Sequence, residues 1–482
     1  MVATLTTPFQ MVIKSTGNTG YKSIVMKNYL FAFIILLSSG AVFGQEVPFK
    51  LLRYDENYTY LAKDTSNSWY HLMKFNPVSA NKKTYFSFGG EVRYQYFHFK
   101  NEDWGEAAND KDGFVLTRYI GHVDFHAGKQ FRTYVELQSS LANGQMETPS
   151  PVDNNPLDLH QAFVDLSAPI GNNQNLILRL GRQELSYGSQ RLVAVREAPN
   201  NRQSFDAAKV MYNTPKVKLD VFYSHYVQAR PGIFDDAFNH NTQFWGVYTT
   251  INKVPLLQNA DLYYLGIWKK SAMFDDGAAS EMRHSVGTRI WMNSPTWQYD
   301  LEGVYQFGKL STSDISAWTA SSNISYTFHT TRLKPQLGLK TEAISGDKNY
   351  NDGRLNTFNP LFPRGSYFGL AALIGPANLF DVHPYYQLSL SKKLVFAQDY
   401  DLFWRMSRND GLYAVNGRLL YSGKNTNSKK VGRQLGTSLE YTPNKFLYFR
   451  EELTWFSAGE YLKETGPGKD IVMLGSTITL KF

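Results

Sequence analysis

The sequence contains no cysteine, which excludes disulfide bonds and thiolate metal sites. It also lacks the repeated apolar runs of about twenty residues that a helical membrane protein needs to cross a bilayer. One comparable run lies near the N-terminus, at 30–37. Hydrophobic residues make up only 43% of the chain, whereas aromatic residues reach 15%. The chain is therefore rich in residues that prefer membrane interfaces, without the apolar content of a helix bundle.

The chain also has no strong excess of positive or negative charge. The chain has 50 lysines and arginines and 42 acidic residues, a net charge of +8. Residues 45–482 alone carry 47 basic and 42 acidic residues, or +5. This excess is too small to indicate nucleic-acid binding, but it favours anionic solutes. The sequence also lacks a Gly-x-Ser-x-Gly elbow and a His-Glu-x-x-His motif, so we expect neither an enzyme nor a cofactor.

The apolar run near the N-terminus has the features of a signal peptide. Lys27 supplies a basic start, 30–37 is the apolar centre, and small residues precede Gln45. We expect residues 26–44 to be a signal peptide that is cleaved near Gly44, the alternative being a true membrane anchor. Residues 1–25 are interpreted as an over-long gene start.

The last eleven residues alternate between apolar and polar side chains. Successive side chains of a strand point to opposite faces, so Leu474 and Leu480 are expected to face lipid, and Thr477 and Thr479 the lumen. A terminal aromatic residue, Phe482, resembles the assembly signal of outer-membrane proteins. An edge strand of a soluble sandwich is the alternative.

The same alternation recurs along residues 85–482, in segments of roughly ten to thirteen residues separated by turn residues, which is typical of a membrane barrel. We predict an all-β fold, a transmembrane antiparallel β-barrel of about eighteen strands, with residues 45–84 as a periplasmic extension or plug. Residues 367–373 are placed in a loop, because a nineteenth strand would make the count odd. A barrel of this size leaves an aqueous channel.

The strands are expected at about 85–99, 113–128, 130–142, 157–168, 175–187, 204–213, 216–228, 242–252, 259–270, 282–292, 296–308, 316–328, 334–345, 382–391, 398–407, 431–441, 446–457 and 470–482. Short turns, such as 213–215 and 293–295, alternate with longer loops. The long loops are expected at 143–156, 188–203, 229–241, 271–281, 346–381 and 408–430.

Inward positions of a porin are expected to be wet, so charged residues there select the solute. Guanidinium groups make bidentate contacts with carboxylates, and an arginine-lined constriction would therefore conduct an acidic sugar polymer. The alternative is that these charges pair across strands and brace the wall. The residues predicted to line the pathway are Arg93, Arg118, Arg132, Arg179, Arg182, Glu184, Arg191, Arg289, Arg405 and Arg450.

Two further features suggest functional residues. The segment 345–365 carries two prolines and two phenylalanines that would stiffen a lid; a surface loop without function is the alternative. Its gating candidates are Asp347, Lys348, Arg354 and Arg364. The strand period also places His122, Asp124 and His126 on one lumenal face, where they would bind a divalent metal or simply line a wet wall.

Three long motifs resemble the alginate export porin family. They are LDLHQAFVDL at 157–166, GRQELSYGSQRLVAVREAPNNRQSFD at 181–206 and SGDKNYNDGRLNTFNPLFPRGSYFG at 345–369. The resemblance covers most of 85–482, and FKLLRYDE at 49–56 resembles Bacteroidetes members.

The resemblance implies an eighteen-stranded barrel in the outer membrane of a Gram-negative bacterium. It would export polyanionic alginate by passive diffusion through an arginine-rich constriction gated by loops. The implied partners are an anionic polysaccharide, outer-membrane lipid and periplasmic polysaccharide-export proteins, and a general or acidic-sugar uptake porin is the alternative. The positions that match family motifs are Arg93, Arg118, Arg182, Glu184 and Arg191.

Overall fold

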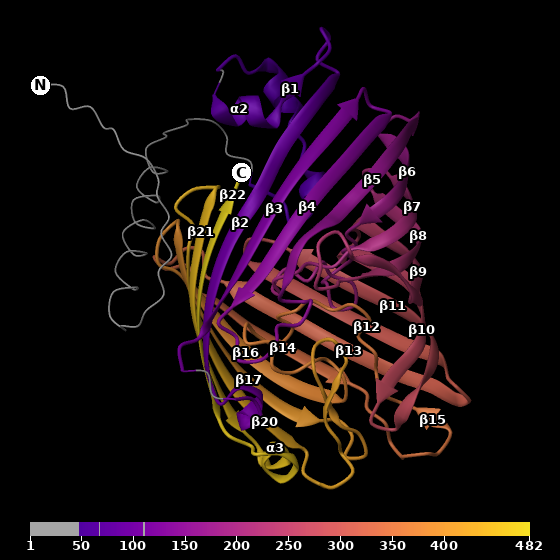
Figure 1. Ribbon diagram of the computed structural model, residues 1–482, viewed down its shortest axis with the longest axis vertical. Coiled ribbons are helices and arrows are strands. Elements are labelled where there is room, and N and C mark those ends of the chain that lie inside the picture. The colour runs from indigo at the N-terminus through magenta and orange to yellow at the C-terminus, as the bar shows by residue number, and fades with distance from the viewer. Residues whose placement is uncertain (1–47, 67, 109–110) are drawn as a thin grey trace, which may run out of the picture. The chain divides into compact units, whose positions relative to one another are not determined.

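The alternating segments form eighteen antiparallel strands that close into a barrel (Figure 1). The computed structural model describes residues 48–66, 68–108 and 111–482, and residues 49–482 form one compact unit. The expected signal peptide, its cleavage point and the segment before it lie outside the described residues. None of the helices in the described part of the chain is both long and apolar enough to span a bilayer.

Each barrel strand pairs with the next along the chain, and the first also pairs with the last, which closes the barrel. The strands are β2 (Thr84–Lys100), β3 (Phe114–Ala127), β4 (Phe131–Asn143), β5 (Asn155–Gly171), β6 (Gln174–Gln183), β7 (Phe205–Asn213), β8 (Val217–Gln228), β9 (Ala237–Val254), β10 (Gln258–Phe274), β11 (Gly277–Asn293), β12 (Trp297–Leu310), β13 (Ser313–Thr327), β14 (Gln336–Ile344), β16 (Leu379–Ser389), β17 (Leu394–Arg405), β20 (Lys430–Tyr441), β21 (Leu447–Ala458) and β22 (Ile471–Lys481).

The predicted strands agree with the observed ones, since each predicted segment overlaps one barrel strand, and residues 367–373 lie in a loop as expected. The long loop expected at 271–281 is wrong. β10 and β11 continue through this stretch and leave only Asp275 and Asp276 in a tight turn. The physical reason is that small residues such as Ala272 remain buried on the inner face, and Gly277, with φ +139°, allows the reversal.

The predicted faces of the first and last strands are confirmed. In β2, Phe88 and Tyr94 are exposed on the outside of the barrel, whereas Glu91 is buried inside it. In β22, Leu474 is exposed and Thr477 is buried. The outer face is thus the apolar and aromatic surface that lipid requires.

The two ends of the barrel differ. At the turn end, short connections join the strands, and this end also carries α2 (Trp69–Lys74), β1 (Asn76–Pro77) and the C-terminus (Figure 1). The loop end carries the connections 184–204, 345–378 and 406–429. The remaining elements are η1 (Arg53–Asp55), η2 (Thr59–Lys63), η3 (Glu102–Gly105), β15 (Arg354–Leu355), β18 (Leu412–Tyr413), β19 (Leu419–Tyr421) and α3 (Glu460–Thr465).

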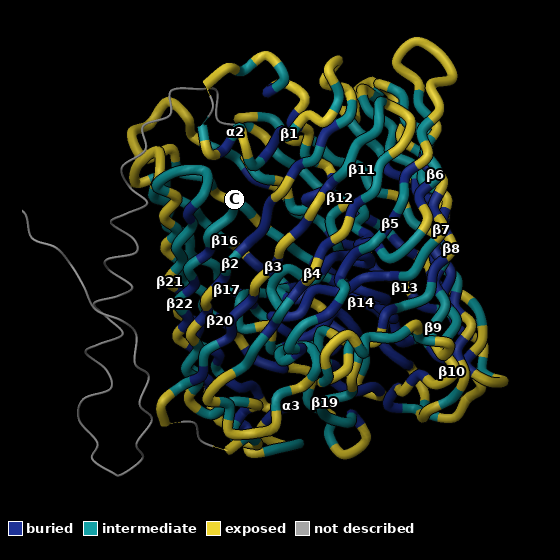
Figure 2. Tube along the Cα trace, turned by 45° about the horizontal axis from the view of Figure 1, so that its top comes forward, coloured by how far each residue is buried: buried dark blue, intermediate teal, exposed yellow. Residues whose placement is uncertain are grey.

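Part of the lumen is filled by an apolar core. Phe205 of β7 and Phe244 of β9 point inward and each lies 5.0 Å, between ring centroids, from Phe362 of the connection 345–378. Val193 of the connection 184–204 forms a parallel bridge to Phe362. Figure 2 shows the buried segments gathered inside the wall. The expectation that every inward position is wet is therefore wrong here, because the long connections fold inward and supply apolar partners.

Candidate functional site in the barrel lumen

In the segment 49–63, the part around η1 inserts into the lumen from the turn end, whereas η2 packs on α2 through Leu61. The Tyr54 ring packs against Tyr134 and Phe163, with centroid distances of 6.1 and 5.4 Å. Its hydroxyl donates to the carbonyl of Glu184 at 3.0 Å, and Arg132 donates to the Tyr54 carbonyl at 2.6 Å. The segment is thus held by the wall and by the start of the connection 184–204.

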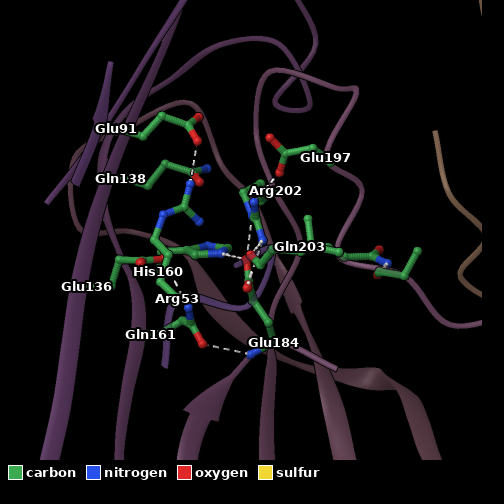
Figure 3. Close-up of polar contacts among 12 residues, drawn as sticks. Arg53, Glu91, Glu136, Gln138, His160, Gln161, Glu184, Glu197, Arg202 and Gln203 are labelled. Atoms are coloured by element: carbon green, nitrogen blue, oxygen red, sulfur yellow. Dashed lines mark hydrogen bonds and ion pairs between the residues drawn. The ribbon is translucent and has the colours of Figure 1, made fainter. Parts of the chain in front are cut away.

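Next to Tyr54, a buried ionic cluster joins the segment to the wall. Glu91 of β2 is fully buried and accepts from Arg53 at 2.6 Å and from Arg118 at 2.6 Å. Arg118 also contacts Glu197 at 2.5 Å. Since Arg53, Glu91 and Glu197 come from the N-terminal segment, the wall and a loop-end connection, the cluster is where all three meet (Figure 3).

The second half of the cluster centres on Glu184, directly after β6. Arg202 donates to both of its carboxylate oxygens, at 2.5 and 2.9 Å, and the ring nitrogen Nε2 of His160 lies 2.9 Å from it. Arg202 also pairs with Glu197 and donates to the carbonyl of Leu51 at 3.0 Å. Figure 3 shows these side chains converging from different strands and loops.

Two carboxylates of the cluster have strongly lowered pKa values. Burial alone would raise the pKa of Glu184, but the charges of Arg202 and the contact with His160 outweigh it and lower the pKa to about 2. Partial burial would also raise the pKa of Glu197, but the charges of Arg118 and Arg202 outweigh it and lower the pKa to about 2. Both groups therefore remain charged at neutral pH.

Two of the predicted pathway arginines hold the connection 184–204 in place. Arg93 donates to the carbonyls of Glu197 and Pro199, at 2.7 and 2.9 Å. Arg118 donates to the same two carbonyls, at 3.1 and 3.3 Å. The side chains of both arginines are buried, so here they bind the protein's own backbone.

The other predicted arginines also have partners within the protein. Arg179 donates to both oxygens of Asp165, at 2.7 and 2.8 Å, and Arg405 donates to four backbone carbonyls of the connection 406–429. Further pairs include Arg132–Asp124, Arg182–Asp206, Arg191–Glu302, Arg191–Glu342, Arg289–Asp261, Arg289–Asp300 and Arg450–Glu452.

The gating candidates separate into two pairs. Asp347 is buried, and its backbone N–H donates to Asp410 at 2.8 Å, which joins the connections 345–378 and 406–429. Arg364 is half-buried and donates to the carbonyl of Tyr367 at 3.2 Å. Lys348 and Arg354 are exposed at the loop end.

Burial raises the pKa of Asp347, and although the N–H of Asn356 lowers it, the nearby charge of Asp410 raises it further, to about 7. Burial also raises the pKa of Asp410, to about 6, against the hydrogen bonds from Thr357 and Tyr413.

The three residues predicted to share a lumenal face of β3 do so, but Asp124 is engaged. Arg132 donates to both of its oxygens at 2.7 Å, and Nε2 of His126 lies 3.1 Å from it. The His122 ring stacks on Tyr134. Among the described residues, the groups whose ligand atoms come close enough to share a metal lie elsewhere in the barrel.

Sequence reasoning missed several members of the ionic cluster, namely Arg53, Tyr54, Glu197 and Arg202. A signal for them was present, because Glu197 and Arg202 lie in the motif 181–206 and Arg53 lies in FKLLRYDE. Their pairing was hidden, since it joins residues of different segments, such as Arg53 and Glu91, which are 38 positions apart, and Arg118 and Glu197, which are 79 apart.

A cavity of about 520 Å³ lies beside the segment 49–63 on the turn side. Five basic and three acidic side chains line it, which leaves an excess of two positive charges. Lys50 and Lys218 are exposed there, and Tyr187 and Tyr248 add aromatic rings. The charged side chains lining it are Lys50, Arg132, Arg179, Lys209, Lys218, Asp55, Asp165 and Asp220.

Comparison with solved structures identifies outer-membrane porins of Pseudomonas aeruginosa as similar folds. OpdO has 12% sequence identity and a TM-score of 0.54, with 82% of this chain and 97% of that chain covered. OpdK solved with vanillate has 10% identity and a TM-score of 0.52, with coverages of 82% and 98%. OccK2 (OpdF) in complex with glucuronate has 12% identity, a TM-score of 0.52 and the same coverages. At such identities the likeness shows the fold alone.

The comparison with curated proteins gave no match. Among protein families, residues 84–470 match the family described as alginate export. This match spans most of the chain and, together with the porin fold, indicates an outer-membrane channel rather than an enzyme. The chain therefore belongs to the alginate export family.

Proposed function

We propose that the chain is an outer-membrane channel through which an anionic polysaccharide, an alginate-like polyuronate, leaves the cell by passive diffusion. The observation that carries this proposal is the turn-end cavity, whose lining has two more positive than negative side chains. A positive field in a narrow, low-dielectric passage concentrates anions. Membership of the alginate export family supports the choice of a polyuronate.

The paired arginines suit such a solute. Each bidentate arginine pair, such as Arg179–Asp165, already presents the geometry that a carboxylate requires. A uronate carboxylate could replace the protein's own carboxylate most easily where that carboxylate reaches water, as the partly exposed Asp206 beside Arg182 and Asp300 beside Arg289 do. A displaced buried carboxylate such as Asp165 would be left without its counter-charge. Within the predicted arginine-lined pathway, the partly exposed pairs are thus the exchangeable ones.

The segment 49–63 is proposed to act as a plug. It occupies the lumen and meets the connection 184–204 at the ionic cluster, so a polymer passes only when the segment moves. A periplasmic polysaccharide-export protein that draws this segment from the turn end would open the channel.

The proposed orientation has the turn end in the periplasm, and the mature protein is proposed to begin after Gly44. The proposal that the chain is of the Bacteroidetes type rests on residues 49–56 alone.

Planar-bilayer recordings test the proposal. We expect currents that reverse at a potential favouring anions and that are blocked by polyuronate oligomers but not by neutral oligosaccharides of equal length. Replacing Lys50 and Lys218 by Gln should reduce both anion preference and block, more strongly at low salt because charges are less screened. Lys253→Gln, at an exposed position near the end of β9 and outside the cavity, is the matched control. A channel that prefers cations would contradict the proposal.

The alternative is a general or acidic-sugar uptake porin. A cavity with two excess positive charges would also admit an acidic monosaccharide. The same recordings separate the two, because a monosaccharide porin would pass glucuronate freely and show no block that strengthens with oligomer length.

A further inference from the structure

Two clusters of one histidine and two carboxylates face the lumen. In each, a ligand atom from every member lies within 4.8 Å of the others. We name them the paired cluster and the unpaired cluster. The paired cluster consists of Glu136, His160 and Glu184, and the unpaired cluster of Asp381, His383 and Asp401.

In the paired cluster, protein groups already satisfy the carboxylates. Arg202 binds both oxygens of Glu184. Glu136 accepts from the Tyr134 hydroxyl at 2.7 Å and from the Gln161 amide at 3.0 Å. This cluster therefore has its counter-charge and its hydrogen bonds, and it does not need a cation.

The unpaired cluster differs in both respects. Asp401 is completely buried; its Oδ1 lies against Nδ1 of His383, and neither carboxylate oxygen accepts a hydrogen bond from any other group. Oδ1 of Asp381 and Nε2 of His383 also have no hydrogen-bond partner, although both residues are at most 3% exposed. A buried carboxylate without a partner costs several kcal/mol. One ligand atom from each of Asp381, His383 and Asp401 lies within 4.8 Å of the other two, so the three side chains converge.

A second carboxylate on the same strand adds to the negative charge. Oδ1 of Asp399 lies 3.7 Å from Nε2 of His383 and is also without a hydrogen bond. Within the described residues, no lysine or arginine nitrogen lies within 4.0 Å of Asp381, Asp399 or Asp401. Three carboxylates thus meet a single imidazole.

The nearest cations are engaged elsewhere. Lys340 of β14 lies opposite His383 in the sheet, but its ammonium sits over the Tyr385 ring, 4.9 Å from the centroid. Arg191 pairs with Glu302 and Glu342, at 3.4 and 3.5 Å. Neither side chain makes an ion pair within 4.0 Å of the unpaired cluster.

The sheet itself explains why these residues meet. Asp381 and His383 are two positions apart on β16, and Asp399 and Asp401 are two positions apart on β17, so all four project to the inner face. The antiparallel register of β16 and β17 brings the two pairs side by side. The ligands are therefore held by adjacent strands of the wall rather than by a mobile loop.

We propose that Asp381, His383 and Asp401 bind a divalent transition-metal cation of the Zn²⁺ class, with Asp399 as a further carboxylate ligand. Imidazole nitrogen combined with carboxylate oxygen suits Zn²⁺ better than Ca²⁺ or Mg²⁺, which prefer oxygen alone. Ligands at about 2.0–2.2 Å from Zn²⁺ lie at most about 4.4 Å apart. Small side-chain rotations would therefore complete the site.

The position of the site gives the cation a structural role. Asp381 lies opposite Glu342 of β14, and Glu342 accepts from the hydroxyl of Tyr367 in the connection 345–378 at 2.9 Å. A bound cation would tie β16 to β17 beside this anchor and stiffen the wall on which the connection rests. This role is independent of the transported solute.

Calorimetric titration of the untagged, refolded full-length chain with Zn²⁺ tests the site. We expect one Zn²⁺ per chain. Asp401→Asn and His383→Gln should each weaken binding at least tenfold, or ~1.4 kcal/mol. His160→Gln, the equivalent change in the paired cluster, should leave it unaltered. Heat-dependent gel mobility checks that each variant forms a barrel.

X-ray absorption of Zn²⁺ bound to the unaltered chain provides a second measurement that needs no variant. A shell of one imidazole with oxygen ligands is expected. The proposal is overturned if the unaltered chain shows no saturable Zn²⁺ binding, if the shell contains two or more imidazoles, or if folded Asp401→Asn and His383→Gln bind Zn²⁺ as tightly as His160→Gln.

Discussion

The lumen is filled in two different ways. Along β7 and β9, the connection 345–378 packs through aromatic rings, with Phe362 against Phe205 and Phe244. Along β2 and β3, the N-terminal segment is held by ion pairs, with Arg53 on Glu91, besides the contacts of the single Tyr54 ring. The aromatic contacts are part of the folded barrel, whereas the ionic contacts are suited to releasing the N-terminal segment from the lumen.

The difference follows from the energetics of the two contacts. Burying a phenylalanine side chain contributes about 1.5–3 kcal/mol, and removing it leaves a cavity that adds to the loss. A buried ion pair gains less, because the desolvation of both charges offsets much of their attraction. Charged groups also exchange one partner for another. The aromatic side of the lumen should therefore stay closed while the ionic side opens.

The largest expected effect is on the aromatic side. Phe362→Ala should lower the free energy of unfolding by about 3–5 kcal/mol, because the ring is almost fully buried among other rings. Urea unfolding of the chain in lipid vesicles measures this. The matched control is Phe234→Ala, since Phe234 is 58% exposed in a loop-end connection, and it should change stability by less than about 0.5 kcal/mol. Equal effects would show that the rings do not form a core.

A smaller effect is expected on the ionic side. Arg53→Ala removes one of two arginines on Glu91, so Arg118 still compensates the carboxylate. The free energy that holds the segment in the lumen should fall by about 1–3 kcal/mol, whereas the free energy of unfolding of the barrel should not change. Faster proteolysis of residues 49–63 in the folded chain and a larger open fraction in bilayers report this.

The control for Arg53 is Lys63→Ala, which removes the same charge from an exposed position of η2. It should alter neither proteolysis nor opening. If Arg53→Ala instead unfolded the barrel, the ionic side would be part of the fold and the contrast between the two fillings would fail.

The smallest effect concerns the contact between Asp347 and Asp410, whose pKa values are raised to about 7 and about 6. A raised carboxyl pKa means that the packed loops bind more protons than the loosened ones. Their contact should therefore be tightest below about pH 4 and weaken as the pH rises to about 7, above which it should change little.

Hydrogen exchange in 345–378, corrected for intrinsic rates, measures this dependence. Asp347→Asn should remove the part of the pH dependence of hydrogen exchange that lies near pH 7. Asp352→Asn, an exposed aspartate of the same connection, should leave it intact. Tightening as pH rises would reverse the sign and contradict the assignment.

The barrel wall could be predicted from sequence because its pattern is local. Inward and outward positions alternate with period two, and the turns between strands have their own residue types. The hairpin around Asp275 and Asp276 was missed because small residues such as Ala272 mask the alternation. β10 nevertheless continues through this stretch, because its residues are buried against the loops that fold inward.

The lumen could be predicted only in part. Arginines of the wall, such as Arg118, were found from their inward positions, but their partners lie far away in sequence. Glu197 and Arg53 are brought to Arg118 by a loop and by the N-terminal segment, and no periodicity encodes such a meeting. For the same reason, the sequence does not distinguish His160 from His383. Only the tertiary contacts show that the carboxylate beside His160 is paired with an arginine, whereas the one beside His383 is not.

The most direct test of the account is the conductance of single channels with and without residues 49–63. The intact chain should be closed or of low conductance for most of the time, and the shortened chain should show a larger, steady, anion-preferring conductance that polyuronate blocks. Refilling by an added peptide of residues 49–63 should restore the closed state, whereas the same peptide with Arg53→Ala should not. Equal conductance of the intact and shortened chains would contradict the account.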